Sequence, residues 1–197
     1  MPRPTKAYGE SKLAAERCVI EAARTRAISG CVLRPAVVFG ADAPGNTDRL
    51  LGLIRRGWVP RIRGGTNRKS MVHIEDLAEA IIRAVEQRER TNGRTYNVAG
   101  DPVSVDTMVR SLARGAGASV RWVPVPAALV ALASGAAHGV SRATGGRIPD
   151  LSRVLEAFAG EATVDAGAIA SELGMRFRPT AAALEEVARE RLRTQAR

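Results

Sequence analysis

Several residue types are scarce in this chain of 197 residues, and their scarcity excludes whole classes of function. Aromatic residues make up only 4% of the sequence, too few for the base-stacking surface of a single-strand nucleic-acid binder. The two cysteines, Cys18 and Cys31, form no CxxC pair, and there are only two histidines. We therefore expect neither a disulfide framework nor a metal site, and both thiols are predicted to be reduced.

The sequence also lacks the signals of export and membrane insertion. No apolar core follows the first residues, so no signal peptide is expected and the predicted location is the cytoplasm. The longest apolar stretch covers residues 123–140, but two prolines, two glycines, a serine and a histidine interrupt it. A buried or interface helix is favoured there over a stable membrane insertion.

Positive charge is abundant, with a formal net charge of +10. Such a charge would allow binding of an anionic partner. Three kinds of partner fit this description: nucleic acid, a membrane surface and a phosphorylated substrate. The alternative is that arginine is simply the preferred surface cation. This alternative is favoured, because no nucleic-acid-binding motif is present. Of the 30 basic residues only Lys6, Lys12 and Lys69 are lysines.

One of these rare lysines stands four residues after a tyrosine. Tyr8 and Lys12 fall in a stretch that is typical of one helix, from residue 4 or 5 to near residue 27, and residues four apart share a helix face. A nearby ammonium stabilises the negative phenolate of a tyrosine. Such a tyrosine can accept a proton from a substrate hydroxyl near neutral pH. The alternative is a solvated helix face with an idle lysine.

Hydrophobic periodicity predicts alternating helices and strands. One buried strand with its exit is expected at residues 31–33 and 36–39, interrupted by Pro35, and a second, short strand is expected at 96–99. Residues 41–70 are expected to be loop-rich, with a short helix at 48–56. Further helices are expected from residue 75 to the turn at 91–93, at 108–116, at 165–173, and after Thr180 as a cap. This order predicts an α/β fold with a parallel sheet, although two buried strands are too few to complete it.

Six stretches stand out along the chain: YGESK at 8–12, LRPAVVFG at 33–40, GGTNRKS at 64–70, VHIEDLA at 72–78, YNVAG at 96–100 and ELGMRFRP at 172–179. Taken together and in this order, they resemble the extended short-chain dehydrogenase/reductase family, and within it the NAD-dependent epimerases and dehydratases of nucleotide sugars. The resemblance implies the C-terminal part of a Rossmann-type parallel sheet domain plus a small, mostly helical substrate domain. The former would comprise residues 1–40 and 71–100, and the latter residues 41–70 and 101–197.

The resemblance also implies roles for single residues. Tyr8 would be the catalytic acid/base, and Lys12 would bind the nicotinamide ribose beside it. Arg68 or Lys69 would bind the substrate diphosphate, and His73 would hold a loop onto the following helix. The segment beside the nicotinamide would be Pro35, Ala36, Val37 and Val38. The implied cofactor is NAD, with NADP not excluded; the implied substrate is a nucleotide sugar, and the complete enzyme is expected to be a homodimer.

The family's Gly-rich phosphate loop has no counterpart here. Gly64 and Gly65 are not followed by a third glycine at the required spacing and do not open a helix. The loop would lie before Met1, so the chain is expected to be truncated and inactive alone. Two alternatives stay open: a non-catalytic remnant or dimerising interaction module, and, less favoured, a basic nucleic-acid-binding protein. The dimer contact would be the alanine-rich face of the first helix, at Ala14, Ala15 and Ala22.

Overall fold

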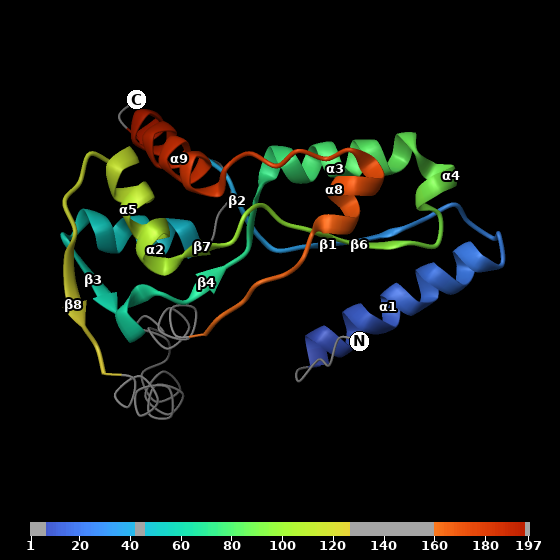
Figure 1. Cartoon of the computed structure of the whole chain (residues 1–197), viewed down its shortest axis with the longest axis horizontal. Helices are drawn as coiled ribbons and strands as arrows, with labels where there is room; N and C mark the ends of the chain where they lie inside the picture. The colour runs from blue at the N-terminus through green and yellow to red at the C-terminus, as the bar shows by residue number, and fades with distance from the viewer. Residues whose placement is uncertain (1–6, 42–45, 127–159, 196–197) are drawn as a thin grey trace.

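Two groups of elements lie side by side in the computed structural model, which describes residues 7–41, 46–126 and 160–195 (Figure 1). One group is built around two parallel strands near the start and middle of the chain. The other gathers helices and short strands from the middle and the end. Most of the apolar stretch expected to form a buried or interface helix, from residue 127 onward, lies outside the described residues.

The first group centres on short parallel strands. β1 (Val32–Pro35) pairs with β6 (Thr95–Val98), and β2 (Val37–Phe39) pairs with β5 (Met71–His73). Ala36 separates β1 from β2, and its N–H donates to the carbonyl of Val98 at 2.9 Å. The interruption lies at Ala36 and not at Pro35 as expected, because Pro35 still pairs with Val98 as the last residue of β1. The fold is α/β with parallel strand pairs.

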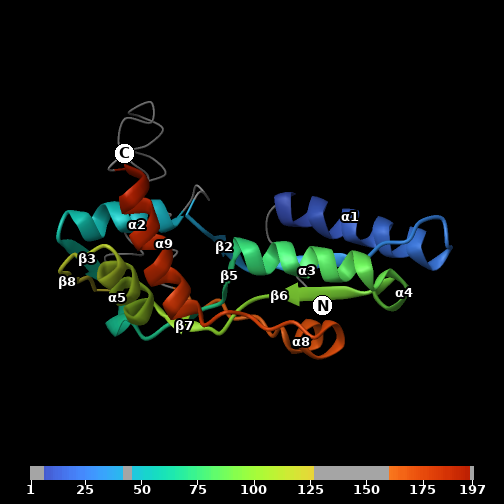
Figure 2. The same cartoon turned by 90° about the horizontal axis from the view of Figure 1, so that it is seen from above.

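Helices flank these strands on both sides. α1 (Ala7–Arg24) lies on one face of the β1–β6 pair and α3 (Ile74–Glu86) on the other (Figures 1 and 2). The short α4 (Arg88–Thr91) follows α3, and α8 (Gly167–Leu173) packs against β6 and α3. Covering of both faces is what a parallel sheet requires, because its strands are apolar on both sides.

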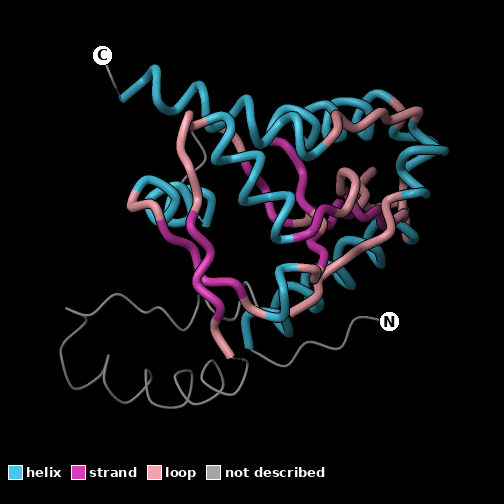
Figure 3. Tube along the Cα trace, turned by 60° about the vertical axis from the view of Figure 1, so that its left-hand side comes forward, coloured by secondary structure: helices cyan, strands magenta, loops and turns pink. Residues whose placement is uncertain are grey.

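The second group contains the remaining elements. Its helices are α2 (Asn46–Arg55), α5 (Val105–Gly115), α9 (Thr180–Gln195) and the 3₁₀ turn η1 (Arg63–Gly65). Its strands are β3 (Trp58–Arg61), β4 (Arg68–Lys69), β7 (Val103–Ser104) and β8 (Arg121–Pro124). β3 and β8 run parallel as a separate pair at one side of the molecule (Figure 3), and β4 pairs antiparallel with β7.

Buried apolar side chains form two clusters, and the β2–β5 pair contributes to both of them, since Phe39 and Met71 lie in one and Val72 in the other. The sheet cluster joins Ala80 of α3, Val98 of β6 and Ile169 of α8, all fully buried. The second cluster joins α2, α5 and α9, through fully buried Ile54, Leu112 and Leu184. The expected domain boundaries place residues 101–197 in the substrate domain. The side chains of α8 pack in the sheet cluster instead, because they cover the face of β6 beside α3.

Three local expectations differ from the structure. The helix expected to reach residues 91–93 breaks at Gln87, whose backbone leaves the helical region at φ −100° and ψ 32°. Thr180 is the first residue of α9, and its hydroxyl donates to the carbonyl of Asp101 at 2.8 Å rather than acting as the expected cap. The segment 41–70 contains two strands, β3 and β4, that pair with residues far along the chain.

Across the described ranges, no helix is both long and apolar enough to span a bilayer.

Candidate functional site

Tyr8 and Lys12 meet on the first two turns of α1. The Lys12 ammonium lies 5.5 Å from the centroid of the Tyr8 ring. This is the approach expected of residues four apart on one helix face, and the distance is within the range of a cation–π contact. Tyr8 is 74% exposed, so its hydroxyl is open to a bound molecule. The structure therefore brings together the two residues that the sequence singled out.

The segment Pro35–Val38 forms the passage from β1 into β2. It lies at the carboxyl end of β1, and ligands of open parallel sheets bind at that edge. The side chain of Val37 is 48% exposed, whereas the ring of Phe39 two residues later is buried against His73. The segment thus offers two exposed apolar residues, Pro35 and Val37, to a ligand at this edge.

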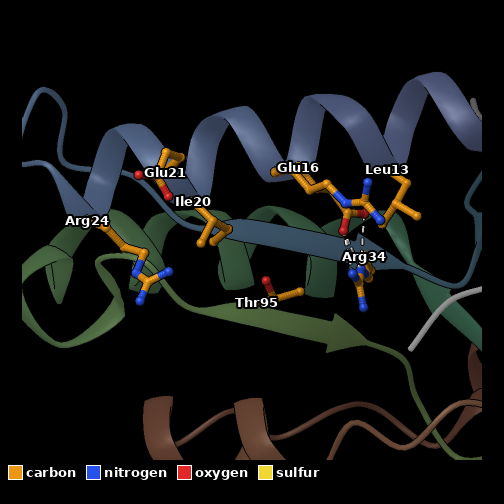
Figure 4. A pocket seen from close by; sticks show the side chains of 8 residues that line it. Leu13, Glu16, Ile20, Glu21, Arg24, Arg34 and Thr95 are labelled. Carbon is orange, nitrogen blue, oxygen red and sulfur yellow. Dashed lines mark hydrogen bonds and ion pairs between the residues drawn. The ribbon is translucent and has the colours of Figure 1, made fainter.

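An ion pair ties α1 to β1. Glu16 of α1 accepts hydrogen bonds from Nε and Nη2 of Arg34, with both Nε contacts at 3.0 Å (Figure 4). The hydrogen bonds that Arg34 donates to Glu16 raise the pKa of its guanidinium. Beside the pair runs a groove of about 340 Å³ between α1 and the strands, lined by Leu13, Ile20, Arg24 and Thr95 among others. The pair fixes the position of the helix that carries Tyr8 and Lys12.

Arg68 and Lys69 lie on β4, in the second group of elements. Nη2 of Arg68 donates to the carbonyl of Pro102 at 2.8 Å. Lys69 is partly buried, and this burial lowers the pKa of its ammonium, against the opposing charge of Glu161. A partly desolvated cation gains from an anionic ligand, so Lys69 is the better placed of the two for a phosphate. Among the described residues, no hydrogen bond, ion pair or ring contact joins either residue to Tyr8 or Lys12.

His73 has a structural role that agrees with its expected one. Its Nδ1 accepts a hydrogen bond from the N–H of Glu75 at 3.3 Å and caps α3. Its ring meets Phe39 edge to face, with centroids 5.4 Å apart. Burial, and then the positive charge of Arg178, lower the pKa of His73, which suits a ring nitrogen that accepts a hydrogen bond.

Sequence reasoning missed the contact between Asp76 and Arg178. Asp76 is 3% exposed and accepts hydrogen bonds from the backbone N–H and Nε of Arg178. Nη1 of Arg178 also donates to Glu75 at 2.7 Å. The sequence placed the two acids in the first turn of a helix but gave no signal of an arginine so far along the chain. The contact connects α3 to the segment that leads into α9.

The described residues include groups that can bind a ribose of a dinucleotide, but they do not include a cradle for its phosphates. The exposed phenol of Tyr8 and ammonium of Lys12 can hydrogen-bond a ribose. The double-glycine turn does not form a phosphate cradle, since a Cβ added at Gly65 would lie 3.3 Å from the Cβ of acidic Asp106. Among residues that the structure describes, no cluster of His, Cys, Asp and Glu has the arrangement of a metal site.

Comparison with known proteins identifies the relatives of this chain. A sequence model of the NAD dependent epimerase/dehydratase family matches residues 1–99. The UDP-glucose 4-epimerase of Vibrio cholerae is 29% identical over 125 residues, which are 62% of this chain and 38% of that protein. Subunit 9 of the NADH dehydrogenase (ubiquinone) 1 alpha subcomplex of Arabidopsis thaliana is 32% identical over 98 residues, 47% of this chain and 22% of that protein.

Solved structures share the fold at low sequence identity. The dTDP-glucose 4,6-dehydratase of Bacillus anthracis, in complex with NAD, superposes with a TM-score of 0.69 at 14% identity over 100% of this chain and 55% of its own. The UDP-glucose 4-epimerase of Thermotoga maritima, with UDP-glucose, gives 0.69 at 19% identity over 100% and 56%. The chain thus spans little more than half of these structures and 38% of the Vibrio cholerae relative. Because the family's sequence model covers half of its residues, the chain belongs to the NAD dependent epimerase/dehydratase family.

Proposed function

We propose that this chain carries the acid/base pair and the substrate-side part of an NAD-dependent enzyme that epimerises or dehydrates a nucleotide sugar. The observation that carries the proposal is the Lys12 ammonium, 5.5 Å from the Tyr8 ring at the exposed start of α1. Family membership supports NAD as the cofactor, with NADP as the alternative. Relatives named for UDP-glucose and dTDP-glucose support a nucleotide sugar as the substrate.

In this proposal each residue acts on a stated atom. As the phenolate, Tyr8 accepts the proton of a sugar hydroxyl, with the Lys12 ammonium beside its ring. Lys12 also donates to a ribose hydroxyl, and residues 35–38 supply backbone groups and the side chain of Val37 to the nicotinamide. Bound NAD supplies the hydride acceptor. Lys69, with Arg68 as the alternative, binds the diphosphate, whose negative charge offsets the desolvation of the ammonium.

The proposal leaves the binding of the cofactor pyrophosphate to residues other than those described. The described residues hold no Gly-rich loop that opens a helix, and such a loop binds the pyrophosphate in dinucleotide-binding folds. We therefore propose that this chain is inactive alone. We also propose a homodimer for the complete enzyme, and a cytoplasmic location.

The proposal is tested by a chimera that places this chain behind the part of the Vibrio cholerae UDP-glucose 4-epimerase that precedes its matched segment. We expect the chimera to epimerise UDP-glucose, and Tyr8→Phe to lower kcat by about 100-fold or more, because the proton acceptor is lost. The matched control is Tyr96→Phe, at the other tyrosine of the chain, which is buried and bonded to Glu172. Equal rates in the chimera and its Tyr8→Phe variant would contradict the assignment.

One observation favours a second candidate, a non-catalytic module that associates through α1. Ala14 and Ala15 are exposed and Ala22 is half-buried, so small side chains lie open along this helix. A relative named as a subunit of a larger assembly is compatible with such a role. This candidate predicts that the chain sediments as a dimer and that the Tyr8→Phe variant still forms the dimer. A nucleic-acid partner is not proposed; it would require binding that weakens steeply with salt.

A further inference from the structure

A groove lies between α5 and β8, at the opposite end of the molecule from α1 (Figures 1 and 2). Its volume is about 300 Å³. It is lined by Arg110, Ala113 and Arg114 of α5, by Ala118 and Val120 of the connection that follows, and by Trp122 of β8. Tyr8 and Lys12 lie outside this groove, so its role does not depend on the proposed function.

The floor of the groove is apolar and firmly held. Ala118, Val120 and Trp122 are half-buried and pack on the buried cluster that joins α2, α5 and α9. Trp122 also pairs in register with fully buried Val59 of β3, and the guanidinium of Arg61 lies 5.4 Å from the centroid of its ring. An indole fixed in this way gives a partner a large contact area at little cost in conformational entropy.

The rim of the groove carries two guanidinium groups, and no carboxylate belongs to the residues that line it. Arg110 and Arg114 are four residues apart on α5, so they share a helix face, with Cβ atoms about 5–6 Å apart. Their side chains are 56% and 59% exposed. In both residues Nε and Nη2 are bonded within the chain, whereas Nη1 donates to no described group. Each guanidinium therefore has a fixed position and an unused donor.

Positive charge remains at this rim after its ion pairs are counted. Each of two carboxylates near the groove accepts hydrogen bonds from two arginines. The groups are Asp106 with Arg61 and Arg110, and Glu185 with Arg114 and Arg189. Four guanidinium groups thus share two carboxylates, and the excess of two positive charges attracts an anion.

The size and composition of the groove favour a protein partner over a small molecule. Small-molecule sites commonly have volumes of about 300–1,000 Å³, so this groove is at their lower limit, and its rim side chains are more than half exposed. Tryptophan and arginine are, in contrast, enriched among the residues that dominate binding between proteins. On a partner helix, two carboxylates four residues apart have the same spacing as Arg110 and Arg114.

We propose that the groove binds an acidic amphipathic helix of a partner protein. Two carboxylates of that helix, four residues apart, accept hydrogen bonds from Nη1 of Arg110 and of Arg114. Aliphatic side chains beside them on the same face cover Val120 and Trp122. An apolar groove recognises one face of an amphipathic helix in this way, and the arginines determine the charge and the register of the partner.

The test uses the whole chain in a Trp58→Phe background, which leaves Trp122 as the sole tryptophan. The probe is a capped, alanine-based peptide of about 16 residues, long enough to populate a helix. It carries two glutamates four residues apart and two leucines on the same face. Titration is expected to shift the emission of Trp122 to shorter wavelength, because the leucines exclude water from its ring, with a Kd of about 100 µM or lower.

Variants of the chain and of the peptide separate the two halves of the contact. Arg110→Gln with Arg114→Gln is expected to weaken binding by about tenfold or more, since both carboxylates lose their donors. The matched control, Arg88→Gln with Arg176→Gln, removes the same charge at two exposed positions outside the groove and is expected to change the affinity by less than about twofold. A peptide with alanine in place of both leucines is expected to bind about tenfold more weakly. Circular dichroism verifies that both double variants fold.

Four results would overturn the proposal. The first three are no binding of the glutamate peptide, equal weakening by the two double variants, and equal affinity of the leucine and alanine peptides. Equal weakening would reduce the interaction to the net charge of the chain. The fourth is self-association of the chain in sedimentation that Arg110→Gln with Arg114→Gln abolishes, because it would assign the groove to a second copy.

Discussion

At the scale of single residues, the Asp76–Arg178 contact joins two segments that lie 102 residues apart in the sequence. Asp76 is nearly inaccessible, and Arg178 donates to it from its backbone and from Nε at 2.7 Å. Removal of one partner from a buried ion pair leaves the other charge without compensation. The guanidinium is 35% exposed, so solvent offsets part of that cost.

We therefore expect Asp76→Ala to lower the free energy of unfolding by about 2 kcal/mol. Glu75→Ala is the matched control, because Glu75 pairs with the same arginine but its side chain is 69% exposed. Its effect is expected to be much smaller, since water replaces the lost contact. Urea unfolding followed by circular dichroism measures both. Equal losses in the two variants would show that burial of Asp76 does not determine the strength of the contact.

Tyr96 gives the chain a stability that depends on pH. Its hydroxyl donates to Glu172 at 2.7 Å, and its ring is 2% exposed. Burial, together with the hydrogen bond to Glu172, raises the pKa of Tyr96 to about 12, from 10.0. Folding therefore favours the protonated phenol, and a proton bound more tightly in the folded state stabilises it below the unfolded pKa.

We expect the free energy of unfolding contributed by Tyr96 to be constant below pH 10 and to fall as the pH rises from 10 to about 12. Tyr96→Phe removes this dependence and costs about 1 kcal/mol at neutral pH, through the lost hydrogen bond. Denaturant titrations at a series of alkaline pH values measure it. The exposed Tyr8→Phe variant is the control and keeps the slope. A slope that persists in Tyr96→Phe would assign the dependence to other groups.

At the scale of elements, the contact between α5 and α9 depends on one glycine. A Cβ added at Gly115, the last residue of α5, would overlap the carbonyl oxygen of Glu185 and lie 2.8 Å from the Cβ of Ala188. Both neighbours belong to α9, and Ala188 is fully buried. The absence of a side chain at this position lets the two helices approach closely.

We expect Gly115→Ala to lower the free energy of unfolding by about 2 kcal/mol, because the inserted methyl group displaces α9. Alanine favours helix over glycine by up to about 1 kcal/mol, so the steric cost must exceed that gain. Gly52→Ala in α2 isolates the gain, since no atom lies within 4 Å of its added Cβ, and this control is expected to be stabilising. Thermal unfolding compares the two. A neutral or stabilising Gly115→Ala would mean that α9 moves aside without cost.

At the scale of the whole molecule, the chain supplies strand ends and a Tyr–Lys pair on one side of a partial sheet. The described glycines at positive φ lie in turns and after helices, such as Gly64 with φ 69° and Gly174 with φ 66°. No described segment combines a strand, a Gly-rich turn and the helix that binds a pyrophosphate. The contacts to a dinucleotide that we propose for this chain are therefore those to one ribose and one ring.

We therefore expect the purified chain to bind NAD no more tightly than about 1 mM by titration calorimetry, because its contacts omit the pyrophosphate. Addition of the polypeptide that precedes the matched segment in the Vibrio cholerae UDP-glucose 4-epimerase is expected to restore binding in the micromolar range. The control is Lys12→Met in the same mixture, which removes the ribose donor and weakens NAD binding. Micromolar affinity of the chain alone would contradict this expectation and would place the phosphate contacts within it.

Local chemistry made part of this structure accessible from the sequence. The Tyr8–Lys12 contact depends only on helical geometry over one turn, so the sequence determined it. The start of α3 near residue 75 and the alternation of helices and strands are local in the same sense. The role of His73 at the start of α3 also follows from its neighbours.

Only the tertiary structure decided which distant segments meet. Arg178 reaches Asp76 across 102 residues, Glu172 reaches Tyr96 across 76, and the hydroxyl of Thr180 bonds Asp101 instead of capping its own helix. The assignment of α8 to the sheet cluster belongs to the same class. Such contacts depend on how whole elements pack around each buried cluster, and local residue spacing carries no information about that packing. The exposure of Ile81 and Val85 on α3 became visible for the same reason, because burial is a property of the assembled elements.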